Sequence, residues 1–137
     1  MDSIGIRQFS IDDYDRAVEI WQQAGLAVRP GDDKASIIRT LEHNPGLFLV
    51  ACAGGEIIGT AIGTYDGRRG HLYHLAVLPA YQGRGIGRRL IDEIGQRLAA
   101  LGCPQLNLSV NLDNTAAVKF YEAIGFETRG LQMGKTL

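Results

Sequence analysis

The stretch YQGRGIGRRL, residues 81–90, places glycine at positions 83, 85 and 87 and then adds two arginines. Glycine costs roughly 1 kcal/mol relative to alanine inside a helix and has no side chain to pack. An apolar strand pattern precedes the stretch, and an amphipathic helix pattern follows it. We therefore expect a strand-to-helix turn at which some group approaches the main chain closely.

An anion is the group that this pattern favours. Free N–H groups of the turn and of the first helical turn can point at one position, and the helix dipole makes that position attractive to negative charge. Arg84, Arg88 and Arg89 add positive charge, and a phosphate or pyrophosphate fits best. The spacing matches neither G-x-x-x-x-G-K-[ST] nor a G-x-G-x-x-G in the first strand–helix turn. A glycine-rich turn that only redirects the chain remains the alternative.

The composition predicts an ordinary globular protein. A chain of 137 residues with 45% hydrophobic and 21% charged residues suits one domain. The net charge of -1 gives no sign of a general nucleic-acid-binding surface. Cys52 and Cys103 lack the spacing of a zinc site or a disulfide framework, so we expect small buried hydrophobes. No signal peptide or membrane span is indicated, and we expect a cytoplasmic protein.

Periodicity and turn signals predict an α/β (α+β) fold in a single domain, residues 1–137. It has a central mixed sheet with an antiparallel N-terminal meander and about four helices, in the order β-α-α-β-β-β-α-β-α-β. Strand 71–78 has apolar residues at both odd and even positions, as a strand covered on both faces should have, so we expect it to be central. Ser10 with Asp13 should cap the first helix, and Asp32 or Asp33 the second. The expected strands are 4–9, 47–53, 56–65, 71–78, 105–110 and a last strand or hairpin at 126–135; the expected helices are 10–25, 34–44, 86–101 and 114–124.

Two motifs resemble those of one enzyme family. QGRGIG, residues 82–87, looks like the [RQ]-x-x-G-x-[GA] acyl-CoA loop of the GNAT N-acetyltransferases and follows LAVLPAY, as in that family. Residues 111–126 read N-x-x-N-x-x-A-x-x-F-Y-E-x-x-G-F and look like its second motif. The pair, in this order of elements, is far more specific than either motif alone. LFLVA, YDGRRG, GCP and the terminal GK are similar to the small bacterial YpeA-like branch.

The resemblance implies acetyl-CoA as co-substrate and no metal. Amides of the loop would hold the CoA pyrophosphate, and the backbone of residues 75–77 would pair with the pantetheine arm. Asn114 would fix that arm, although a plain N-cap is an equally good interpretation. The implied CoA site is Leu75, Ala76, Val77, Gln82, Gly83, Arg84, Gly85, Ile86, Gly87, Arg88, Asn114 and Ala117.

The catalytic assignments are carried over in the same way. Tyr121 stands where many family members protonate the departing CoA thiolate, and a phenol suits that task chemically. It also lies on an apolar helical stripe, so a core tyrosine is the alternative. His71 stands where several members have a carboxylate base. No acidic residue lies in strand 71–78, so a water relayed through His71, Tyr73 or His74 is open, as is a merely structural His71.

The acceptor is expected to be a small-molecule or peptide amine. Arg29 lies in the loop that often covers the acceptor site in the family, where it and Tyr73 could contact the substrate; a solvated loop charge is the alternative for Arg29. We expect neither nucleic acid nor a membrane as partner, and a monomer or homodimer. An acyl-CoA-binding sensor without catalysis, or a phosphate-binding regulatory module, are the rival functions.

Overall fold

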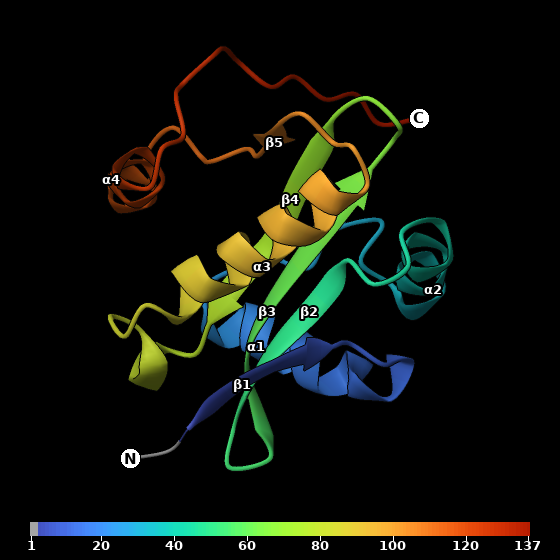
Figure 1. Ribbon diagram of the computed structural model, residues 1–137, viewed down its shortest axis with the longest axis vertical. Coiled ribbons are helices and arrows are strands. Elements are labelled where there is room, and N and C mark those ends of the chain that lie inside the picture. The colour runs from blue at the N-terminus through green and yellow to red at the C-terminus, as the bar shows by residue number, and fades with distance from the viewer. Residues whose placement is uncertain (1–2) are drawn as a thin grey trace. The chain divides into compact units, whose positions relative to one another are not determined.

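The computed structural model describes residues 3–137 and divides into two compact units, Met1–Asn107 and Leu108–Leu137. The first unit carries the sheet and most of the helices (Figure 1). The second unit contains a single helix, α4, at Thr115–Ala123. In the first unit the elements are β1 Ile4–Gln8, η1 Ile11–Asp13, α1 Tyr14–Gln23, α2 Lys34–His43, β2 Phe48–Ala53, β3 Glu56–Tyr65, β4 Gly70–Val77, η2 Pro79–Tyr81, α3 Ile86–Ala100 and β5 Leu106–Asn107.

The five strands form one sheet in the order β1-β2-β3-β4-β5. The first four pair antiparallel, which confirms the predicted meander, and β5 is parallel to β4. β4, the strand predicted to be central, lies in the interior of the sheet between β3 and β5, although β3 is the middle strand. β4 has strands on both sides only at Gly70 and His71, which pair with Leu106 and Asn107. Apolar residues at both odd and even positions predict cover over the two faces of a strand and do not specify how far a neighbouring strand pairs with it.

The sheet separates α1 from α3, which lie on opposite faces (Figure 1). Alternation along β3 shows this residue by residue. The Thr60 hydroxyl accepts a hydrogen bond from the Trp21 indole of α1. A Cβ built at Gly63, three residues on, would lie 2.9 Å from Ile94 of α3. The missing Cβ therefore lets α3 approach the sheet closely.

The core on the α1 face is aromatic. Phe9 and Phe48 stack with ring centroids 3.8 Å apart, and Trp21 packs beside Phe48. Phe9 and Trp21 are buried, and Tyr14 is half-buried. The expected capping contact is also present, because the Ser10 N–H donates to the Asp13 carboxylate at 2.9 Å.

Two of the predicted strands differ from the structure: one is shorter and one is not formed. The predicted strand 105–110 is formed only at Leu106–Asn107, since β4 pairs with it at two residues. Residues 126–137 contain no strand, so the predicted strand or hairpin at 126–135 was wrong. That segment carries Gly130 and Gly134 among charged residues, a composition with little strand propensity. A strand also needs an edge to pair with, and periodicity alone does not supply one.

Candidate active site

The glycine loop between β4 and α3 has the open main chain that an anion site needs. Gly83 and Gly85 adopt φ values of +79° and +76°, which favour glycine. A Cβ at either position would meet nothing within 4 Å, so this space is open. Gly87 lies inside α3, so two of the three glycines, not all three, serve the turn. The first intrahelical bond runs from the Arg89 N–H to the Gly85 carbonyl, which leaves the amides of residues 86–88 without helical partners.

Side chains around the loop fix its place next to β4. The Gln82 side-chain amide donates to the Val77 carbonyl at 2.9 Å. The Arg84 guanidinium lies over the Tyr81 ring, 5.1 Å from its centroid, and Arg88 is exposed. Arg89 instead donates twice to the carbonyl of Ile4 at 3.1 Å. Arg84 and Arg88 therefore carry exposed guanidinium groups beside the loop, with Arg88 also 3.9 Å from an Asp92 carboxylate oxygen. The Arg89 guanidinium is instead bonded to a neutral carbonyl.

β4 offers a free main-chain edge directly before the loop. Its ladder with β5 stops at His71. Beyond that residue, the β5 side of β4 has no strand partner in the described part of the chain, residues 3–137. An extended molecule with amide groups could pair with this edge as an added strand does. Leu75, Ala76 and Val77 lie on this stretch, with Ala76 buried and the other two half-buried.

A bulge interrupts β4 on its other side. Thr60 pairs with Ala76, but Ile62 pairs with Tyr73, so His74 and Leu75 together stand opposite Ala61. Residues directly opposite one another lie on the same face. The extra residue therefore inverts the alternation of β4.

The inversion decides what each face of β4 carries. Leu72, opposite Gly63, faces α3, whereas Ala76, opposite Thr60, faces α1. His71 and Tyr73 pair with Thr64 and Ile62, so both lie on the α1 face.

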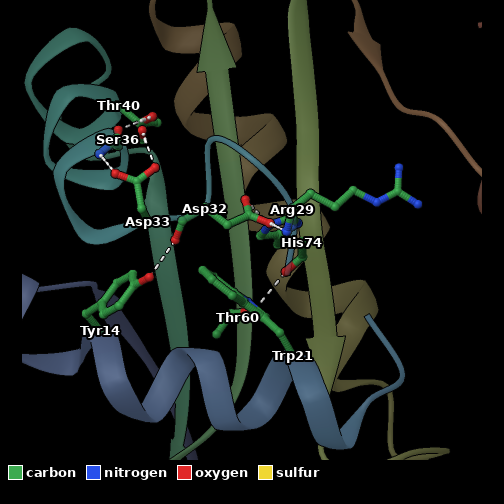
Figure 2. A network of polar contacts seen from close by, with 9 residues as sticks. All are labelled: Tyr14, Trp21, Arg29, Asp32, Asp33, Ser36, Thr40, Thr60 and His74. Atoms are coloured by element: carbon green, nitrogen blue, oxygen red, sulfur yellow. Dashed lines mark hydrogen bonds and ion pairs between the residues drawn. The ribbon is translucent and has the colours of Figure 1, made fainter. Parts of the chain in front are cut away.

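His74 holds an unusual backbone conformation at this bulge. Its φ of +51° makes it the sole non-glycine residue in the left-handed region between residues 3 and 137. That conformation costs roughly 1–2 kcal/mol for a residue with a Cβ. Three contacts oppose the cost. The Nε2 atom lies 2.7 Å from Asp32 Oδ1, the ring packs against Trp21 with centroids 4.5 Å apart, and the carbonyl accepts from the Thr60 hydroxyl at 2.8 Å (Figure 2).

Asp32 connects the loop after α1 to this bulge. It is 9% exposed, and its second carboxylate oxygen accepts the Arg29 main-chain N–H at 2.9 Å. Its carbonyl accepts from the Tyr14 hydroxyl at 2.6 Å. Asp33, not Asp32, caps α2 by accepting the Ser36 N–H. Sequence reasoning missed the Asp32–His74 pair, because the two residues are 42 positions apart and no motif joins them.

The predicted substrate-side residues lie in the first unit. His71 is half-buried and stacks on Tyr73, with ring centroids 6.0 Å apart, and Tyr73 is 47% exposed. Arg29 is exposed, and its side chain extends away from the Asp32 network (Figure 2). The face of β4 that bears His71 and Tyr73 is also the face that bears the Asp32 contact to His74.

The remaining predicted residues lie in the second unit. The Asn114 side chain accepts the Ala117 N–H at 3.1 Å, so it is an N-cap as one interpretation expected. Tyr121 packs edge-on against Phe120 and Phe126, with centroids 5.2 and 5.6 Å away. Burial raises the pKa of the Tyr121 phenol above its ordinary value, so the hydroxyl keeps its proton at neutral pH. Their roles toward a cofactor stay predictions.

Comparison with known proteins identifies the class that this fold and loop define. The model of the Acetyltransferase (GNAT) family matches residues 8–126, and the chain belongs to that family. It is 42% identical over 134 residues to an acetyltransferase of Sodalis glossinidius (strain morsitans), covering 96% of this chain and 94% of that one. An acetyltransferase of Yersinia pseudotuberculosis serotype I is 41% identical over 133 residues, with the same coverage.

Solved structures share the fold at lower identity. The PaiA N-acetyltransferase of Thermoplasma acidophilum, in complex with coenzyme A, has a TM-score of 0.85 at 23% identity and covers 95% of this chain and 93% of that chain. Ard1 of Thermoplasma volcanium has a TM-score of 0.83 at 24% identity, covering 93% and 84%. As a family member, this protein is an N-acetyltransferase with acetyl-CoA as donor.

The residues present fit that donor. The open left-handed glycines and the unpaired amides at the start of α3 match a pyrophosphate, and the free edge of β4 matches an amide-bearing arm. Between residues 3 and 137 no three His, Cys, Asp or Glu side chains converge as metal ligands would. Both cysteines are free and half-buried. None of the helices described here is long and apolar enough to cross a bilayer.

Proposed function

We propose that this protein transfers the acetyl group to a primary amine by direct attack in a ternary complex. The observation that carries the proposal is the glycine loop, in which Gly83 and Gly85 are left-handed, and which lies between an unpaired strand edge and a helix N-terminus. We further propose that residues 1–137 act as a single catalytic domain and that the enzyme works in the cytoplasm.

Donor binding would use main-chain groups first. The amides of the loop and of the first turn of α3 would hold the pyrophosphate, with the guanidinium groups of Arg84 and Arg88 close by. The backbone at Leu75, Ala76 and Val77 would pair with the pantetheine amides, and Asn114 and Ala117 would contact the same arm. Gln82 would position the loop, because its side chain donates to the Val77 carbonyl and its main-chain N–H donates to the Pro79 carbonyl.

Acetyl-CoA supplies an acyl group activated as a thioester. In the transfer a C–N bond forms to the amine and the C–S bond breaks, giving an amide and the CoA thiol. The amine loses a proton. We propose that His71 is the base that removes it, either directly or through a water molecule. Tyr121 would give a proton to the departing thiolate, since its phenol, whose pKa is raised by burial, is protonated at neutral pH. A main-chain N–H of β4 would polarise the thioester carbonyl.

The acceptor side would lie on the α1 face of β4. His71 and Tyr73 stack there, and the loop that carries Arg29 is tied to the same face through Asp32. We infer that the acceptor is a small-molecule or peptide amine and that Arg29 meets a carboxylate on it. We expect the enzyme to act as a monomer or homodimer without nucleic acid or membrane.

Calorimetric titration with acetyl-CoA, with ADP and NADH as controls, tests the donor site without knowledge of the acceptor. We expect one-to-one binding of acetyl-CoA and much weaker binding of the controls. Equal binding of all three would favour a general phosphate-binding module instead. CoA release should then be measured with free amino acids, polyamines, a peptide N-terminus and an aminoglycoside. Intersecting initial-rate lines support direct attack, parallel lines contradict it, and tight binding without turnover of any amine favours a sensor.

A further inference from the structure

We propose that Asp32 and Thr60 are positioning residues for acetyl transfer, because they hold the backbone of His74 in the left-handed conformation that forms the β4 bulge. The bulge would then set where the main-chain groups of β4 stand against the thioester. The proposal rests on the proposed function, since it assumes that the donor lies along β4. It assigns His74 a structural task through its backbone and no proton transfer.

The register of β4 shows what the bulge achieves. One extra residue between Tyr73 and Ala76 puts Tyr73 on the α1 face and leaves Ala76 on that face as well. Without it, a regular ladder would place these two residues, which differ by an odd number of positions, on opposite faces. The predicted acceptor-side residues and the donor-side stretch of β4 therefore take their present orientation only while residue 74 stays out of the regular ladder.

The contacts of His74 account for that backbone conformation from two sides. The Thr60 hydroxyl donates to the His74 carbonyl, and the same oxygen accepts from the Trp21 indole, so it links both groups. Thr60 is fully buried, and its side chain has no alternative partner in water. The His74 side chain makes the second contact, with the Asp32 carboxylate. Because a carboxylate oxygen can only accept a hydrogen bond, Nε2 of His74 is the donor.

Asp32 is itself held rigidly. Figure 2 shows the Tyr14 hydroxyl directed at its carbonyl and the His74 ring against its carboxylate. The Arg29 main-chain N–H occupies the other carboxylate oxygen. The loop before α2, helix α1 and the β4 bulge are thus joined at one residue. A change at Asp32 would reach the bulge without removing any group expected to touch the donor.

A pair of variants at His74 separates backbone positioning from imidazole chemistry. His74→Ala and His74→Gly both remove the ring, but only glycine adopts a φ near +51° without strain. The probe is acetyl-CoA labelled with ¹³C at the thioester carbonyl, bound to the intact protein and observed by infrared difference spectroscopy. We expect the bound carbonyl band at lower frequency than in free acetyl-CoA for wild type and His74→Gly, and near the free value for His74→Ala.

Thr60 provides the second arm of the test. Thr60→Val keeps the shape and removes the hydroxyl, whereas Thr60→Ser keeps the hydroxyl. We expect Thr60→Val to return the band toward the free value and Thr60→Ser to retain the wild-type shift. Acetyl-CoA affinity should stay within about threefold in both, because the loop amides are unchanged. Thr64→Val, at a half-buried threonine of β3 outside the network, should leave the band at its wild-type position.

The outcomes distinguish this proposal from the function on which it rests. A wild-type protein that does not bind acetyl-CoA overturns both. A shifted band in wild type that persists in Thr60→Val and His74→Ala, both folded by circular dichroism, overturns the positioning role alone. Equal loss of the shift in His74→Ala and His74→Gly would mean that the imidazole itself acts, which also contradicts the proposal.

Discussion

The side-chain amide of Gln82 donates to the main-chain carbonyl of Val77 at 2.9 Å, folding the first residue of the glycine loop back onto the end of β4. In a longer sheet, an N–H group of a neighbouring strand would donate to this carbonyl, and here the Gln82 side chain takes that place. The bond also fixes the loop relative to the free edge of β4. If the loop binds a pyrophosphate, the arm attached to that pyrophosphate would therefore begin beside β4.

Replacing Gly85 with alanine should weaken acetyl-CoA binding by about tenfold or more, measured by calorimetry. The new Cβ would enter the open space beside the loop amides and would hold a phosphate away from them. The left-handed φ of +76° adds a folding cost of roughly 1–2 kcal/mol.

Gly102→Ala is the matched control for that experiment. Gly102 follows the other end of α3 with a φ of +88°, and a Cβ there also meets nothing within 4 Å. Both variants should lose similar stability in urea unfolding, but only Gly85→Ala should lose affinity. Equal affinities would remove the loop from the donor site.

Tyr121→Phe should lower the rate of CoA release with a turned-over amine by about 100-fold and leave acetyl-CoA affinity unchanged. The variant keeps the ring among Phe120 and Phe126 and removes only the acidic hydroxyl. Because burial raises the pKa of Tyr121 above 10, its ionisation should cause no decline in the wild-type rate between pH 6 and about pH 9. Tyr65→Phe, which removes a hydroxyl bonded to the Gly67 carbonyl, is the control. An unaltered rate in Tyr121→Phe would leave this residue a core tyrosine.

Asp13→Asn should lower the free energy of unfolding at pH 7 by about 1 kcal/mol. The loss is expected to be this small because Arg7 is half exposed, so solvent screens its interaction with Asp13. The Arg7 guanidinium donates to both carboxylate oxygens, at 2.8 and 3.0 Å, and so lowers the pKa of Asp13. A lowered folded-state pKa stabilises the fold above the unfolded value near 3.9, and this contribution disappears as the pH falls through the folded value.

Urea unfolding at several pH values checks this dependence. The difference between wild type and Asp13→Asn should be constant from pH 7 to about pH 5 and shrink below about pH 4. Asp12→Asn, at an exposed neighbour in the same turn, should change stability by less than about 0.5 kcal/mol. A difference that grows toward low pH would contradict the sign of the pKa shift.

Gly63→Ala should destabilise the fold by about 1–3 kcal/mol in thermal or urea unfolding. Its Cβ would lie 2.9 Å from Ile94 Cγ2 and 3.4 Å from the Leu47 carbonyl oxygen, so α3 would have to shift. Gly95→Ala, one residue after Ile94 in the same helix, meets no neighbour and should instead stabilise by about 0.5–1 kcal/mol. Similar losses in both would show that the close packing of α3 on β3 is not the cause.

Local patterns predicted the features that depend on neighbours in the chain. The strands expected at 47–53 and 56–65 pair as β2 and β3, and the amphipathic helix expected after the glycine stretch is formed as α3. The Asn114 cap is formed as well, because turns, caps and helices are specified within a few residues. The strand predicted at 126–135 failed, because a strand exists only through a partner that the local sequence does not name.

The sequence by itself determined the family, through two motifs that resemble those of the GNAT acetyltransferases, and the order of most elements. The elements follow from turn residues, cap residues and periodicity, all of which act over short separations. Only the tertiary structure decided that His74 leaves the regular ladder, that Asp32 and Thr60 hold it there, and that Arg89 is committed to the Ile4 carbonyl. Each of these contacts joins residues 14 to 85 positions apart. Such pairings are fixed by how the sheet and helices pack, and no local signal encodes them.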